Sequence, residues 1–115
     1  MSAPPNRVFE LRTYTAPEGK LESLLARFRD HTLALFARHN ITSLAYFTPR
    51  EGPLAGRTLI YLLAHLSREA AEQNWNAFRA DPDWLEARAA SESDGPVVAH
   101  IESVFLDPAD FSPLK

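Results

Sequence analysis

The chain has 115 residues, of which 45% are hydrophobic and 23% charged, and its formal net charge is -3. This composition predicts one globular domain and argues against disorder. Nucleic-acid binding is not expected because the charges form no basic stripe, and no apolar run is long enough to span a bilayer. The lack of cysteine excludes disulfides and thiolate ligands and is compatible with the expected cytoplasmic location.

Residues 1–7 contain two prolines and no apolar signal-peptide core, so they predict a flexible leader before a first strand at 8–15. Apolar and polar residues alternate along this strand, which gives it two different faces. Phe9 and Leu11 are expected to pack against helices. The opposite face carries the polar residues Glu10, Arg12 and Tyr14. If a partner subunit covers that face, these side chains would line a pocket.

A helical period of apolar residues predicts a first helix over residues 18–39, which Asn40 can end in a left-handed conformation. Strands are predicted over residues 41–48 and 58–66, with a loop rich in proline and glycine between them. The second of these strands is apolar at nearly every position. That pattern is typical of a central strand that is covered on both faces.

Ser67 is a good N-cap for a second helix, and Asp81 can cap a shorter helix that begins at Pro82. Residues 97–106 are expected to form the last strand. The tail, residues 107–115, holds two large apolar side chains besides its prolines and aspartates. We therefore expect it to dock on the surface of the domain.

The order strand, helix, strand, strand, helix, strand is the split βαβ pattern of the ferredoxin-like sandwich. It predicts an α+β fold: an antiparallel four-stranded sheet with its first and third strands in the centre and helices on one face. The other face is expected to be too apolar for water because it would carry Leu59, Tyr61 and Leu63. We predict that a second copy covers it, which would make a homodimeric α/β barrel.

Several short motifs, in their order and spacing, resemble those of the NIPSNAP family. They are Glu10-Leu11-Arg12-Thr13-Tyr14, Arg38-His39, Gly52-Pro53-Leu54 and Asp81-Pro82-Asp83-Trp84. The resemblance covers residues 8–106, the predicted domain. It implies the dimeric α/β-barrel fold that is shared by small monooxygenases, haem-degrading enzymes and isomerases, but it implies no particular reaction.

The candidate site combines the polar face of the first strand with residues that the third and fourth strands and the helices can add. The predicted catalytic residues are His65, His100 and Tyr61. The predicted substrate-binding residues are Glu10, Arg12, Tyr14, His39, Trp84 and Glu102. In this hypothesis Arg12 orients an anionic group, a tyrosine donates a hydrogen bond and a histidine moves a proton. The alternative is that these polar groups only pair with one another.

Cofactors are not expected. The four histidines include no close pair, so no metal site is predicted, whereas haem needs only one suitably placed histidine and stays an alternative. Trp75, Phe78 and Trp84 have a spacing typical of core packing, with a lid over a pocket as the alternative. A small organic ligand is expected, bound either by a monooxygenase or isomerase without a cofactor or by a non-enzymatic dimeric binding module.

Overall fold

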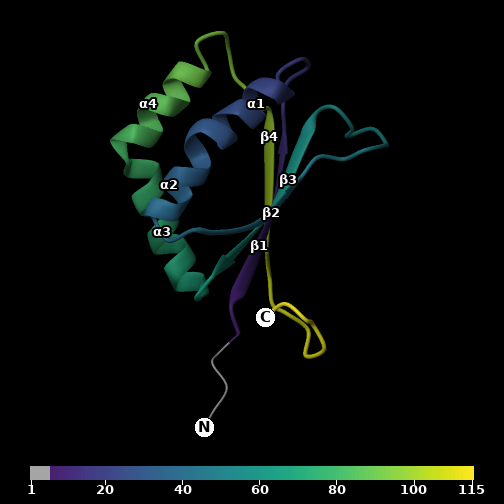
Figure 1. The fold of residues 1–115 in the computed structure, drawn as a ribbon, viewed down its shortest axis with the longest axis vertical. Helices are drawn as coiled ribbons and strands as arrows, with labels where there is room; N and C mark the ends of the chain where they lie inside the picture. The colour runs from purple at the N-terminus through teal and green to yellow at the C-terminus, as the bar shows by residue number, and fades with distance from the viewer. Residues whose placement is uncertain (1–5) are drawn as a thin grey trace.

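The computed structural model describes residues 6–115, and its antiparallel four-stranded sheet is covered by helices on one face only (Figure 1). The strands are β1 (Val8–Thr15), β2 (Thr42–Phe47), β3 (Thr58–His65) and β4 (His100–Leu106). Their order, β2-β3-β1-β4, places β1 and β3 in the centre. The predicted α+β, ferredoxin-like fold is confirmed. Residues 1–5 of the predicted leader lie outside the described residues.

The first helix contains a π-helical turn. It consists of α1 (Leu21–Arg27), the π turn η1 (Phe28–Thr32) and α2 (Leu33–Arg38). The backbone N–H of Leu33 donates to the carbonyl of Phe28, five residues earlier, so the helix continues through a wider turn. Asn40 then ends the helix with φ 60°, as predicted.

The two later helices begin at the predicted caps. The Ser67 hydroxyl accepts a hydrogen bond from the N–H of Ala70 at 3.0 Å and caps α3 (Arg68–Ala80). Asp81 accepts from the N–H of Asp83 at 2.9 Å and caps α4 (Pro82–Ser91). Ladder pairing of β4 begins three residues later than predicted because the chain first turns inward to bury Val97.

The two sheet faces are the reverse of the sequence-based prediction. Glu10 pairs across the sheet with Leu63, and Arg12 with Tyr61, and this face lies beneath the helices. Leu59, expected on the uncovered face, is likewise in the core. Period-two alternation separates two faces but does not say which one the helices cover. Here α3 covers the polar residues of β1 because it brings a hydrogen-bond donor to Glu10.

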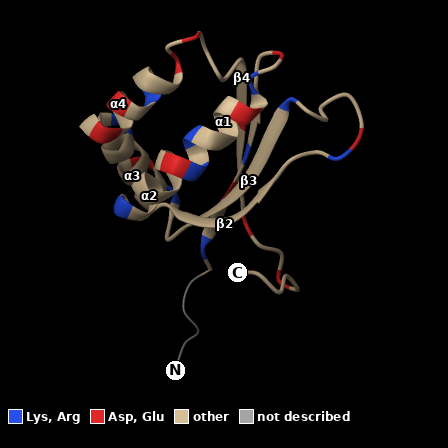
Figure 2. Ribbon diagram, turned by 45° about the horizontal axis from the view of Figure 1, so that its top comes forward, with Lys and Arg blue, Asp and Glu red and all other residues tan. Residues whose placement is uncertain are grey.

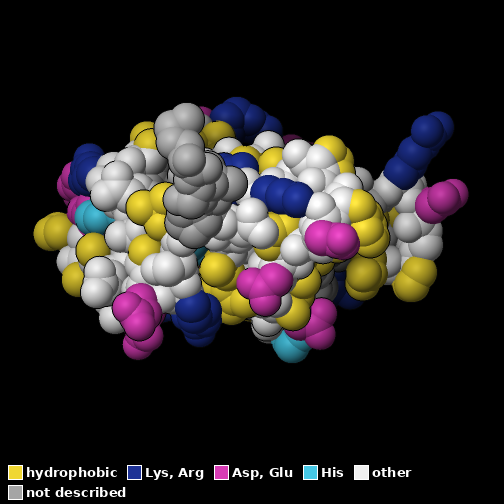
Figure 3. Space-filling view, turned by 90° about the horizontal axis from the view of Figure 1, so that it is seen from below, with side chains coloured by type: hydrophobic (Ala, Val, Ile, Leu, Met, Phe, Trp, Pro, Cys, Tyr) yellow, Lys and Arg dark blue, Asp and Glu magenta, His cyan; other side chains and the backbone are white. Residues whose placement is uncertain are grey.

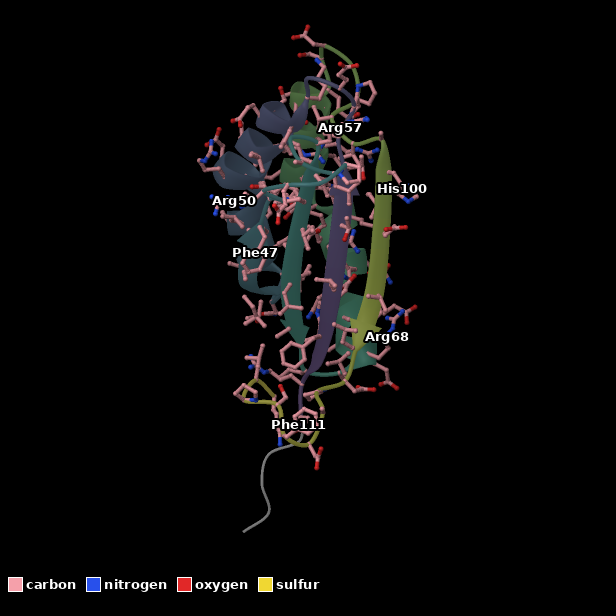
Figure 4. All side chains as sticks on the ribbon, turned by 90° about the vertical axis from the view of Figure 1, so that its right-hand side faces the viewer. Phe47, Arg50, Arg57, Arg68, His100 and Phe111 are labelled. Atoms are coloured by element: carbon pink, nitrogen blue, oxygen red, sulfur yellow. The ribbon has the colours of Figure 1, made fainter. Side chains whose placement is uncertain are left out.

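The uncovered face is largely apolar, although its residues are not the predicted ones and its β4 edge also carries His100 and Glu102. β2 and β3 carry no Lys, Arg, Asp or Glu, as the tan strands in Figure 2 show. By register, the face presents Leu11, Ala45, Phe47, Ile60, Leu62, Val104 and Leu106. Figure 4 looks onto this face, with Phe47 at one edge, where it is 59% exposed. In Figure 3, hydrophobic side chains reach the surface in the right half of the molecule, on the side away from the helices.

The C-terminal tail lies across one end of the uncovered face. Together with Phe9, Leu62 and Leu106 of the sheet, the tail borders a hollow. Of these three sheet residues, Phe9 is buried. The Arg7 Nε donates to the backbone carbonyl of Lys115 at 3.1 Å. Phe111 does not share in this burial: its ring is 86% exposed (Figure 4). Between residues 6 and 115, no helix has the length and apolar character needed to cross a membrane.

Removal of the α3 cap should destabilise the domain measurably. We expect Ser67→Ala to lower the free energy of unfolding by about 1 kcal/mol, because the N–H of Ala70 loses its acceptor. Ser93→Ala is the matched control, since it removes an exposed hydroxyl outside any helix and should change stability by less than about 0.5 kcal/mol. Urea unfolding followed by circular dichroism measures both. Equal losses in the two variants would contradict the capping role.

Candidate functional site

A buried carboxylate lies at the centre of the helix-covered face. Glu10 is 1% exposed, and each of its oxygens accepts two hydrogen bonds. One oxygen accepts from His65 Nε2 and from Trp75 Nε1, both at 2.8 Å. The other accepts from Arg12 Nη1 at 2.8 Å and from the Ser103 hydroxyl at 2.7 Å. This carboxylate therefore joins the three strands β1, β3 and β4 to helix α3.

The four donors keep Glu10 ionised. Burial alone would raise the pKa of this carboxyl group, but the hydrogen bonds from His65, Ser103, Trp75 and Arg12 outweigh burial and lower the pKa to about 2. The second ring nitrogen of the histidine, Nδ1, is buried and has no hydrogen-bond partner among residues 6–115.

Arg12 extends the network from Glu10 towards two phenols. Its Nε donates to the Tyr61 hydroxyl and its Nη2 to the Tyr14 hydroxyl, both at 2.8 Å. Its guanidinium also lies 4.4 Å from the ring centroid of Trp75. Burial raises the pKa of Tyr61 well above its ordinary value, so this phenol stays protonated. Both phenol oxygens accept from Arg12, and a hydrogen bond with Tyr14 also raises the pKa of Tyr61.

Next to this network lies a cavity of about 540 Å³ between the sheet and the helices. Six aromatic side chains line it: Tyr14, Phe28, Phe36, Trp75, Phe78 and Trp84. Its charged lining consists of Arg12, Arg27, Arg79, Arg88 and Glu92. The cavity therefore combines an aromatic wall with a set of guanidinium groups, which suits a small molecule that has both an apolar body and polar groups.

Arg27 is the most deeply buried cation of this lining. Its side chain is 4% exposed, and its Nη1 lies 3.3 Å from the Ser91 hydroxyl and 3.4 Å from a Glu92 carboxylate oxygen. Its guanidinium carbon lies 5.1 Å from the ring centroid of Trp84. Burial lowers the pKa of Arg27, and the attraction of Glu92 offsets this only in part. It is the last residue of α1, directly before the π turn.

The structure brings some of the predicted site residues together and separates others. Four of them, Arg12, Tyr14, Trp84 and His100, line the cavity, whereas Glu10, Tyr61 and His65 are buried behind it and do not line it. His100 and Glu102 do not join the Glu10 network, because their register pairs them with Thr15 and Thr13 on the uncovered face. The His100 Nε2 lies 3.5 Å from Glu102 at the exposed edge of β4 (Figure 4).

His39 lies away from the cavity. Its Nε2 is 2.7 Å from Asp81, and Arg38 approaches the same carboxylate at 2.9 Å. The pKa of Asp81 is lowered to about 2, chiefly by the hydrogen bond from His39. This pairing ties the end of α2 to the start of α4, which is a structural task. Among residues 6–115, no three His, Asp or Glu side chains gather in an arrangement that could hold a metal ion.

Sequence reasoning missed four charged residues that line the cavity. They are Arg27, Arg79, Arg88 and Glu92. Arg27 is a charged residue on a helix, which ordinarily faces solvent, but its spacing of three from Leu24 places it beside the buried stripe. Arg88 and Glu92 are spaced i, i+4, which is the usual signal of a pair on one helix face. These signals were present but did not indicate a cavity.

A family model described as NIPSNAP matches residues 9–113. No curated protein sequence matches the chain. A NIPSNAP family protein of unknown function from Agrobacterium tumefaciens has a solved structure that is 24% identical, with a TM-score of 0.82 over 96% of this chain and 95% of that chain. An uncharacterised NIPSNAP domain protein from Burkholderia xenovorans is 26% identical, with a TM-score of 0.79 over 92% and 98% of the two chains.

A more distant similarity is to a proposed antibiotic biosynthesis monooxygenase from Chloroflexus aurantiacus. It is 15% identical and has a TM-score of 0.59 over 96% of this chain and 100% of that chain. This similarity concerns the fold alone.

The Glu10 network predicts a loss of stability in acid. The pKa of Glu10 is about 2 in the folded protein, against an ordinary value of 4.5. Its contribution to the free energy of unfolding is therefore complete above pH 4.5 and disappears as the pH falls towards about 2. The difference corresponds to about 3 kcal/mol of unfolding free energy. Glu10→Gln should be less stable at neutral pH and should lose less stability on acidification than the wild type.

Urea unfolding at pH values from about 6 to 2 spans this interval and measures the effect. Glu72→Gln, an exposed carboxylate change on α3, is the control and should keep the wild-type pH dependence. If Glu10→Gln lost as much stability in acid as the wild type, the carboxylate would not be the group responsible.

Proposed function

The chain belongs to the NIPSNAP family, and we propose that it is a homodimer that binds a small organic molecule in the cavity between its sheet and its helices. The observation that carries this proposal is the cavity itself. Its volume of about 540 Å³ lies within the usual range for small-molecule sites. An aromatic wall with a few convergent polar groups is the usual lining of such sites.

Binding is better supported than catalysis. Two of the predicted catalytic groups, His65 and Tyr61, do not line the cavity, and their polar atoms are engaged with Glu10 and Arg12. The Tyr14 hydroxyl is the phenol that lines it and could donate to a ligand. We therefore favour the binding module over a monooxygenase or an isomerase, which only the fold of a 15% identical relative supports.

Haem does not fit the residues of this cavity. Among the described residues that line it, His100 is the one histidine, and its exposed ring pairs with Glu102 on the uncovered face of the sheet. Axial ligation needs a nitrogen directed at the iron. The small-molecule proposal consequently includes no tetrapyrrole.

The uncovered sheet face supports the homodimer. It presents apolar side chains from all four strands, including Phe47 and Val104, and no helix of residues 6–115 covers it. A contiguous apolar face of this kind is typical of an interface between subunits. A two-fold axis that lies between two such sheets, parallel to them, would place the same face of two chains together.

Ligand binding should be visible in the intrinsic fluorescence. The chain has two tryptophans, and both Trp75 and Trp84 line the cavity. We expect compounds of suitable size to change the emission saturably, with one site per chain. Val98→Phe adds a ring to the lining and should weaken binding by about tenfold. Ala90→Phe adds the same ring to the exposed side of α4 and should leave binding unchanged. Equal affinities of the two variants would contradict binding in this cavity.

Dimerisation should depend on the uncovered face. Light scattering at micromolar concentration should give the mass of two chains for the wild type. Val104→Lys should give one folded chain, because burying the added charge between two sheets is costly. Ala77→Lys adds the same charge to the exposed side of α3 and should remain dimeric. A wild-type mass of one chain would contradict the homodimer.

A further inference from the structure

We infer that the cavity takes an organic carboxylic acid, and that in the ligand-free protein Glu92 occupies the place on Arg27 that the acid's carboxylate would take. The inference rests on the proposed small-molecule binding and adds the chemical class of the ligand. It also assigns Arg27 and Glu92 as a positioning pair that no sequence motif indicated. The charge of the lining, the contacts of Arg27 and the position of Glu92 carry it.

The described lining of the cavity is strongly cationic. Four guanidinium groups face a single carboxylate, that of Glu92. Arg12 is neutralised from behind by Glu10 at 2.8 Å, but Arg27 and Arg88 share Glu92 at 3.4 and 3.5 Å. The whole chain has a net charge of -3, so this excess of positive charge is a local property. Such an environment favours an anionic ligand.

Arg27 is the most deeply buried of these cations, and its charge is only loosely compensated. Its hydrogen bonds to Ser91 and Glu92, at 3.3 and 3.4 Å, are longer than the roughly 2.7–2.9 Å of a strong charge-assisted bond. Both bonds use Nη1, and the buried Nε has no partner among residues 6–115. A ligand carboxylate that replaces Glu92 at Nη1 can approach to that shorter distance, because it is not tethered to the end of α4 as Glu92 is. A ligand carboxylate would therefore improve on the present contacts.

Glu92 can leave Arg27 at little cost. It is the C-cap of α4, where the negative end of the helix dipole disfavours a carboxylate. Its side chain is 31% exposed and already contacts Arg88 on the solvent side. When a ligand acid approaches Arg27, Glu92 can keep this second, exposed partner. The ligand carboxylate thus takes the place of the Glu92 carboxylate on Arg27, while Glu92 stays with Arg88. Each of the two cations keeps a carboxylate partner.

The neighbouring aromatic rings define the body of the ligand. Trp84 lies beside Arg27, and the ring of Phe78 lies 4.7 Å from that of Trp84. A flat apolar group attached to the carboxylate would pack against these rings. We therefore expect an acid with an aromatic or similarly flat body in place of a small hydrophilic acid.

The test compares one charged and one uncharged probe, 1-naphthoate and 1-naphthamide, by tryptophan fluorescence titration of the full chain. In the wild type we expect the acid to bind about tenfold more tightly than the amide. Glu92→Gln removes the internal competitor and should strengthen binding of the acid by about tenfold, with no change for the amide. Arg27→Gln should reduce the affinity for the acid to that for the amide. Glu86→Gln, an exposed carboxylate change on α4, is the control and should alter neither affinity.

The outcomes separate this inference from the proposed function. Equal binding of acid and amide in the wild type and in Glu92→Gln would overturn the inference and leave the binding function standing. Weaker acid binding in Glu92→Gln would overturn the role of Glu92. If a library of small compounds gives no saturable signal at all, both proposals fail. Should Arg27→Gln not fold, the difference between the responses of the acid and the amide to Glu92→Gln still decides.

Discussion

The arrangement of the whole domain depends on the ionised side chain of Glu10. Its two oxygens hold donors from β1, β3, β4 and α3, so one carboxylate fixes three strands and a helix relative to one another. A buried charge is tolerated only when it is fully hydrogen-bonded, and each of these donors is therefore needed. Arg12 continues the network to the phenols and forms the floor of the cavity. The stability of the domain and the geometry of the cavity therefore depend on the same few hydrogen bonds.

Much of the fold could be predicted because its signals are local. The N-caps at Ser67 and Asp81 and the left-handed residue Asn40 each act within one turn of chain, and all three were identified from sequence. The orientation of the sheet could not be predicted in this way. Glu10 and Arg12 are typical of an exposed or interface strand, and their burial under a helix becomes favourable through donors that are distant in sequence, among them His65, Trp75 and Ser103.

The candidate site was predicted only in part. Arg12, Tyr14 and Trp84 were selected from strand alternation, aromatic spacing and family resemblance, and they do line the cavity. Arg27 and Glu92 were missed, because a charged residue on a helix is ordinarily assigned to solvent. His39 matched the family motif, but its contact with Asp81 gives it a structural task. Motif resemblance and closeness to the cavity are therefore separate properties in this chain.

The π turn explains how one helix serves two tasks. Each residue of an α-helix advances about 100° around the axis, and the wider turn at η1 takes up additional backbone without breaking the helix. The turn consequently acts as a phase shift: residues before and after it follow separate helical registers. The first register buries Arg27 beside the cavity, and the second packs Leu35 and Phe36 into the core. A single uninterrupted α-helical register would rotate one of these sets away from its present neighbours.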